Sequence, residues 1–126
     1  MREKIVLLAA ALALANCESV ANIGPPPGNA RALIKAYIEE TFSDPDSLRE
    51  VAIGDPEPGH IIFETGWIVC LQENHRDRSG GYAGLARTAY LISSDQIIKV
   101  VKDAPVCAEK TLQPWPELAN RTGASK

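Results

Sequence analysis

The sequence predicts an α+β domain in which one N-terminal helix packs on an antiparallel meander of three to four strands. Apolar residues recur at the helical period before Pro45 and at alternate positions after it, which indicates a helix followed by strands. The chain has 126 residues, of which 45% are hydrophobic and 23% charged. This size and composition suit one compact domain and exclude a disordered chain.

The first 16 residues have the pattern of a signal peptide. A short, mostly basic start, Met1–Lys4, is followed by an unbroken apolar run, Ile5–Ala15. A helix of about 11 residues rises about 16 Å, roughly half the hydrocarbon thickness of a bilayer, so the run is too short for a membrane span. The alternative is a buried N-terminal helix, but the run has no polar face at helical spacing.

The segment Leu14-Ala15-Asn16-Cys17 resembles the lipobox of bacterial lipoproteins. In that family the cysteine is thioether-linked to diacylglycerol and becomes the first residue after cleavage. Asn16 departs from the pattern, because Gly, Ala or Ser usually precedes the cysteine. The resemblance implies lipidation at Cys17 and a protein anchored in the bacterial cell envelope, facing the periplasm. The alternative is cleavage after the small-x-small sequence Ala13-Leu14-Ala15, which would release a soluble periplasmic protein.

The cysteine count favours the lipoprotein interpretation. The three cysteines are Cys17, Cys70 and Cys107, and an odd number in an exported protein leaves one thiol unexplained. If Cys17 is acylated, Cys70 and Cys107 are free to form a disulfide, which an oxidising compartment favours over two buried thiols. That disulfide closes a loop of about 38 residues and contributes about 4 kcal/mol in the chain-entropy model.

The mature chain is predicted to consist of a lipidated cysteine and proline-rich linker over residues 17–28, a single domain over 29–119 and a disordered tail over 120–126. The helix begins near Asn29, a favourable N-cap residue, and ends before Asp44-Pro45. The elements after it are predicted as strand Leu48–Ile53, turn Gly54–Gly59, strand His60–Glu73, loop Asn74–Gly81, strand Tyr82–Ser93, turn Ser94–Asp95 and strand Gln96–Val101. Gly66 indicates a bulge or bend in the long strand.

Two segments resemble a family of small exported bacterial proteins to which no activity is assigned. Residues Cys70 to Gly84 fit the pattern C-x3-N-x5-G-G-Y-x-G, and Asp44-Pro45-Asp46-Ser47 fits the D-P-x-S that precedes it. The likeness extends over roughly residues 30–95 and implies an exported domain. The residues have a physical interpretation as a hairpin: Asn74 bonds neighbouring backbone, Gly80-Gly81 allows positive φ, and Gly84 permits a close approach. The alternative is a ligand-binding loop.

Two surface features are candidates for recognition. The first is the polar loop, which carries two arginines on an acidic protein, and the second is a tryptophan between two prolines. Arginine and aromatic side chains are enriched in interface hot spots. The candidate recognition residues are Asn74, His75, Arg76, Arg78, Tyr82 and Trp115. The alternative for Trp115 is a core plug that pins the C-terminal segment.

The sequence offers no catalytic constellation. His60 and His75 lack the spaced companions of a metal site, and Gly80-Gly81 is followed by neither a helix start nor a P-loop lysine. We therefore expect no metal, no cofactor and no enzymatic activity. The net charge of −3 argues against a nucleic-acid partner. The predicted function is a non-enzymatic module that binds or scaffolds another envelope protein; the alternative is a small periplasmic inhibitor of a hydrolase such as lysozyme, and a third hypothesis is an enzyme.

Overall fold

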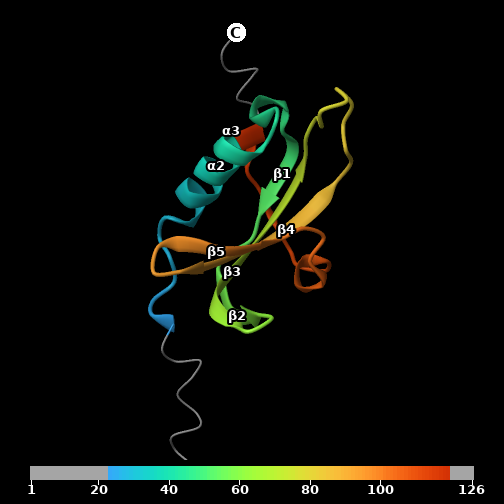
Figure 1. The fold of residues 1–126 in the computed structure, drawn as a ribbon. Coiled ribbons are helices and arrows are strands. Elements are labelled where there is room, and N and C mark those ends of the chain that lie inside the picture. The colour runs from blue at the N-terminus through green and yellow to red at the C-terminus, as the bar shows by residue number, and fades with distance from the viewer. Residues whose placement is uncertain (1–22, 120–126) are drawn as a thin grey trace, which may run out of the picture.

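A computed structural model describes residues 23–119 as an α+β domain, so the predicted fold class is confirmed (Figure 1). The predicted strand number is wrong, because the sheet has six strands among these residues. The elements in chain order are α2 (Ala30–Thr41), η2 (Pro45–Ser47), β1 (Arg49–Ile53), β2 (Glu57–Ile61), β3 (Glu64–Asn74), β4 (Ala86–Ser93), β5 (Gln96–Val101), η3 (Pro105–Cys107), β6 (Gln113–Pro114) and α3 (Pro116–Ala119). The predicted signal peptide, Cys17 and the tail 120–126 lie outside the described residues.

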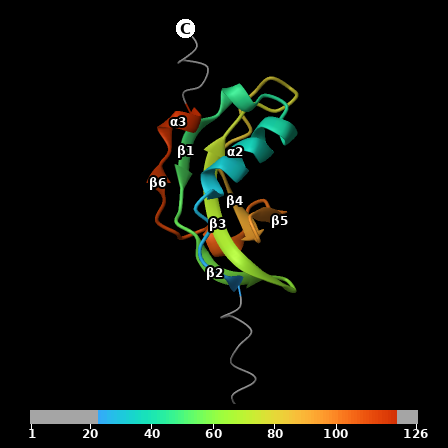
Figure 2. The same cartoon turned by 90° about the vertical axis from the view of Figure 1, so that its left-hand side faces the viewer.

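The helix α2 covers one face of the sheet (Figures 1 and 2). Asn29 occupies the predicted N-cap position, although its side chain makes no capping hydrogen bond. Ile34 and Ile38, one turn apart, are fully buried against the sheet. The helix ends at Thr41, shortly before Pro45, as the proline predicts.

The predicted single strand from residue 60 to 73 is wrong, because the chain turns within this range and forms two strands, β2 and β3. β2 and β3 are the arms of a hairpin that pairs Ile61 with Glu64, so Ile62 and Phe63 form its two-residue turn. β1 pairs with the other half of β3, on the same side of β3 as β2. Residues Gly54–Pro56 connect β1 to β2 and leave a short gap in the pairing along this side. The predicted turn Gly54–Gly59 is therefore shorter than expected, because Glu57, Pro58 and Gly59 belong to β2.

Strands β3, β4 and β5 form the predicted meander. Ser94 and Asp95 make its second turn, as predicted, with φ of 51° and 60°. Gly66 is not a bulge, because β2 and β3 stay in register through it. A Cβ at Gly66 would lie 2.6 Å from the Ile92 carbonyl oxygen, so the glycine allows a close approach of β4. β4 begins at Ala86, four residues after the predicted Tyr82.

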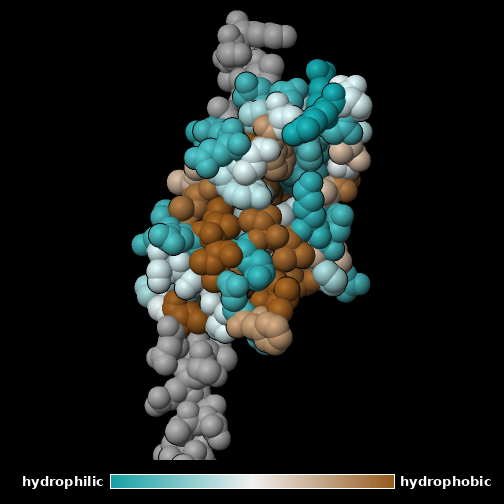
Figure 3. Space-filling model, viewed as in Figure 1, coloured by the Kyte–Doolittle hydropathy of each residue, from teal (hydrophilic) through white to brown (hydrophobic). Residues whose placement is uncertain are grey.

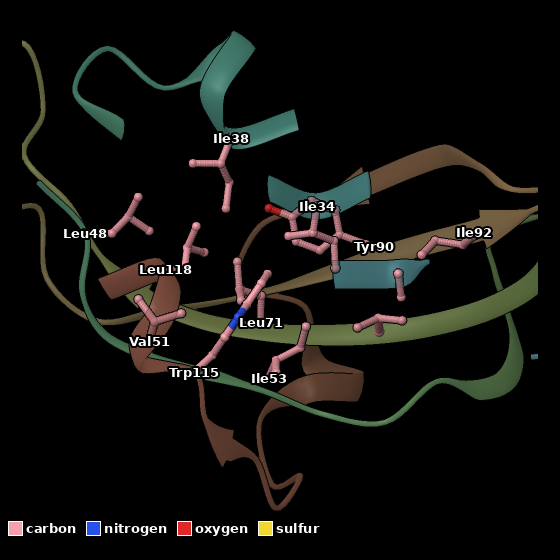
Figure 4. Packing of buried hydrophobic residues seen from close by; sticks show 12 residues of the cluster. Ile34, Ile38, Leu48, Val51, Ile53, Leu71, Tyr90, Ile92, Trp115 and Leu118 are labelled. Carbon is pink, nitrogen blue, oxygen red and sulfur yellow. The ribbon is translucent and has the colours of Figure 1, made fainter. Parts of the chain in front are cut away.

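The main core lies between α2, α3 and the sheet (Figure 4). The backbone amide of Trp115 donates a hydrogen bond to the Val51 carbonyl oxygen (2.8 Å), and the Trp115 side chain closes this core next to Leu118. The buried residues of this helix-side cluster are Ala30, Ile34, Ile38, Leu48, Val51, Ile53, Val69, Leu71, Tyr90, Ile92, Trp115 and Leu118. Among residues 23–119, no helix has the length and apolar character needed to cross a bilayer.

The opposite face of the sheet carries a smaller core built around the predicted disulfide, which is confirmed. Cys70 of β3 and Cys107 of η3 are bonded, and both are buried. Arg87 of β4 adds a second attachment, since its Nη1 donates to the carbonyl oxygens of Cys107 (2.9 Å) and Lys110 (2.8 Å). The buried residues of this disulfide-side cluster are Ile68, Cys70, Ala89, Leu91, Ala104 and Cys107.

Candidate functional site

The connection between β3 and β4 holds five of the six candidate recognition residues. We call residues 74–84 the recognition loop; it lies at the upper end of the sheet in Figure 1, drawn in yellow. Backbone hydrogen bonds close the loop on itself, from Asp77 N to Gly81 O (3.0 Å) and from Ala83 N to His75 O (2.9 Å). The loop therefore has a defined shape from which its arginines project.

Asn74 fixes the base of the loop. Its side chain is buried at the end of β3, and its Oδ1 accepts a hydrogen bond from Gly84 N (2.9 Å). Gly80 has the predicted positive φ, 89°. Gly84 also has a positive φ, 105°, but nothing lies within 4 Å of its Cβ position. The predicted close approach at Gly84 is thus wrong, and its backbone conformation is the reason for a glycine there.

The two segments that carry the family resemblance contact each other through Ser47. Its hydroxyl donates to the Asp44 carbonyl oxygen (2.7 Å) and accepts from the Arg76 amide (2.8 Å). The Tyr82 hydroxyl donates to the Ser47 carbonyl oxygen (3.0 Å). The turn Asp44–Ser47 therefore serves as a support on which the recognition loop is mounted.

Two arginines flank the Tyr82 ring. The Arg49 guanidinium carbon lies 3.6 Å from the ring centroid, and that of Arg76 lies 5.4 Å from it. Both distances are within the range of cation–π attraction. This group borders a surface cleft of about 290 Å³ that extends to Asp46 and Ala119. Sequence reasoning missed Arg49, because only the folded chain brings the start of β1 next to the loop.

His75 is turned toward the helix instead of solvent. Its Nδ1 lies 2.7 Å from Oε2 of Glu73, which is 1% exposed, and its ring lies 4.5 Å from that of Phe42. This hydrogen bond supplies the polar partner that the buried Glu73 side chain requires. His75 is therefore a support of the loop and not a solvated loop histidine. A second cleft, of about 320 Å³, lies here and is also lined by Arg78 and Lys102.

The charges on the loop have mixed sign. The Ser79 hydroxyl and amide both donate to Asp77 Oδ1, and these bonds lower the pKa of that carboxyl. Asp77 therefore stays ionised beside the exposed Arg76 and Arg78. The loop surface therefore carries charges of both signs close together.

Trp115 does not join this surface. It is only 6% exposed and belongs to the helix-side cluster, with the Arg31 guanidinium 5.2 Å from its ring centroid. The core-plug alternative describes this position, and a role for Trp115 in surface recognition is wrong. Proline on both sides, Pro114 in β6 and Pro116 at the start of α3, restricts the backbone around it.

Within residues 23–119 no cluster of three or more histidine, cysteine, aspartate or glutamate side chains is arranged to hold a metal ion. No family model matches the chain, and no curated protein or solved structure matches it either. The geometry thus offers a hydrogen-bonded loop with exposed arginines and a tyrosine, supported from beneath by Ser47, Asn74 and His75.

Proposed function

We propose that the protein is a bacterial envelope lipoprotein, anchored to a membrane through an acylated Cys17 and facing the periplasm. The observation that supports this proposal is the Cys70–Cys107 disulfide, because it pairs the two other cysteines of the sequence with each other and leaves Cys17 outside the pair. A lipobox-like sequence around Cys17 gives that thiol a chemical use. The alternative remains a soluble periplasmic protein that begins at Asn16.

The folded domain acts as a non-enzymatic module that binds or scaffolds another envelope protein through the recognition loop. The support is the contrast between a fixed loop backbone and the exposed arginines on it and beside it, Arg76 and Arg78 in the loop and Arg49 of β1. A preorganised loop loses little conformational entropy on binding, which favours recognition. Tyrosine and arginine are among the side chains that are enriched in the binding hot spots of protein interfaces.

The proposal is tested by capture of partners from bacterial membranes with the tagged full-length chain. We expect a specific partner that is retained by the wild type and lost by the pair Arg76→Ala and Arg78→Ala. Lys35→Ala is the matched control, because Lys35 is an exposed cation on α2, away from the loop, and its loss should leave capture unchanged. Failure to capture any specific partner, or equal capture by all variants, contradicts the binding role.

The intact mass of the mature protein tests the anchor. We expect a chain that begins at Cys17, carries acyl groups and is lighter by two hydrogens because of the disulfide. A mass that corresponds to an unmodified chain starting at Asn16 contradicts the lipoprotein and favours the soluble alternative.

Inhibition of a hydrolase such as lysozyme is the second candidate. The observation that favours it is the position of the recognition loop, which extends beyond the end of the sheet where it could enter a substrate cleft (Figure 1). Lysozyme activity measured with and without the purified protein decides this candidate. Unchanged activity removes lysozyme as the target, while inhibition that is lost with Arg76→Ala supports it.

A further inference from the structure

The most exposed large apolar side chains of the described domain lie at the turn of the β2–β3 hairpin. Phe63 is 97% exposed and Ile62 is 67% exposed. In the view of Figure 3, hydrophobic surface gathers in the lower half of the molecule, over β5 and toward this hairpin, while the part around α2 is largely hydrophilic. A pair of exposed apolar residues at the end of a projecting hairpin indicates an interaction surface.

The backbone of this turn gives a second, independent reason to assign it a role. Ile62 has a φ of 57°, a conformation that is strongly unfavourable for a β-branched residue. Two-residue hairpin turns favour asparagine, aspartate or glycine, and the β4–β5 turn of this same sheet uses Ser94 and Asp95 at such angles. The fold therefore does not need isoleucine and phenylalanine in this turn, and the positive φ of Ile62 costs stability.

The hairpin lies at the end of the domain where the N-terminal segment enters. Ile23 and the prolines after it line a cleft with Trp67 and the β4–β5 turn, and Figures 1 and 2 both place this segment at the lower end, beside β2. Cys17 and Ile23 are six positions apart, with five residues between them. A chain of that length spans at most about 20 Å, so a bilayer attached at Cys17 would face this end of the domain.

The charges beside the hairpin do not oppose contact with a bilayer. Glu64, the first residue after the turn, forms an ion pair with Lys99 of β5 (3.4 Å). Lysine near an apolar contact keeps its ammonium group in water while its stem lies on apolar surface. Phenylalanine and aliphatic side chains are the residues that enter the boundary between headgroups and acyl chains.

We propose that Ile62 and Phe63 insert into the interface of the bilayer that holds Cys17, so that the domain has two points of attachment. This inference rests on the lipid anchor of the proposed function. Its consequence is a fixed orientation. The turn and the recognition loop lie at opposite ends of β3, which has 11 residues and a length of about 35 Å. The loop is thereby held that far from the membrane and faces the periplasm.

The test uses the full chain, processed in a bacterial host and reconstituted in vesicles of phosphatidylethanolamine and phosphatidylglycerol. A nitrobenzoxadiazole fluorophore is attached at Phe63→Cys or, as a matched control, at Leu85→Cys, an exposed apolar position (58%) next to the recognition loop. We expect a blue shift and a rise in emission on reconstitution at position 63 and no change at position 85.

A second variant separates insertion from folding. The pair Ile62→Gly and Phe63→Asn places glycine at the one turn position with a positive φ, so we expect an equal or higher melting temperature. A fluorophore at His60→Cys, on β2 beside the turn, should then lose the emission shift that it shows with the native turn.

Two outcomes overturn the inference and leave the anchor in place. One is water-like emission at position 63 in a chain whose mass shows acyl groups. The other is a shift at position 63 that requires no vesicles and depends on protein concentration, which identifies a second copy as the occupant. A mass without acyl groups instead overturns the lipoprotein proposal. The inference then fails as well, because it requires a bilayer attached at Cys17.

Discussion

The two faces of β3 are both buried, but different interactions secure them. On the helix side, α2 and α3 pack on the sheet to form a cluster of 12 buried residues, most of them large. On the other side, within residues 23–119, no α-helix contributes to the core, and its six buried residues include the two cysteines of the disulfide between β3 and the short 3-10 helix η3. The comparison teaches that a sheet face without a helix can be secured by a covalent bond and a short segment, where the apolar area alone would be small.

Loss of the disulfide should have the largest effect. The pair Cys70→Ala and Cys107→Ala removes a link between residues 37 apart, so we expect a loss of about 4 kcal/mol in the free energy of unfolding. Urea unfolding followed by tryptophan fluorescence measures the difference, and wild type with a reductant should reproduce it. A loss below about 1 kcal/mol would mean that the apolar contacts and Arg87 hold η3 on their own.

A cavity on the helix side should have a comparable, somewhat smaller effect. Ile38→Ala removes a fully buried side chain under α2, and we expect a loss of about 3 kcal/mol. The effect should add to that of the disulfide, because the two sites belong to separate clusters on opposite faces. Ile98→Ala, at a position that is 39% exposed, is the control and should change stability little. Strong non-additivity would show that the two cores act as one.

The smallest effect on the free energy of unfolding is expected from Tyr90, a residue of the helix-side cluster, and only at alkaline pH. Burial raises the pKa of Tyr90, and Tyr37 and Glu73 nearby raise it further. An unfolded tyrosine ionises at about pH 10, so the contribution of Tyr90 to stability is complete below that pH and is lost progressively as the pH rises above it. Tyr90→Phe should therefore give a shallower alkaline decline in the free energy of unfolding. Identical slopes for the two proteins would contradict this.

Local patterns predicted the elements whose signals are local. The apolar stripe and Pro45 gave the helix and its end, and Ser94-Asp95 gave a turn because polar residues tolerate positive φ. The turn at Ile62 escaped prediction since it has none of the usual turn residues. β6 escaped because a strand of two residues has no periodicity.

The candidate site divides in the same way. Five predicted residues lie together because they are neighbours in the chain, from Asn74 to Tyr82. The contact of Ser47 with this loop, the approach of Arg49 to Tyr82 and the burial of Trp115 are long-range contacts. No periodic pattern encodes such contacts, so the sequence predicted the loop but not the residues from other segments that contact it, Ser47 and Arg49.

The sequence by itself determined the α+β class, the helix, the meander and the single disulfide pairing open to the domain, because composition, periodicity and cysteine number are properties of the chain. Only the tertiary structure decided that β1 and β2 share one edge of β3, that Trp115 faces inward and that Phe63 faces outward. These choices depend on which apolar surfaces meet, and that is set by packing between segments far apart in the chain.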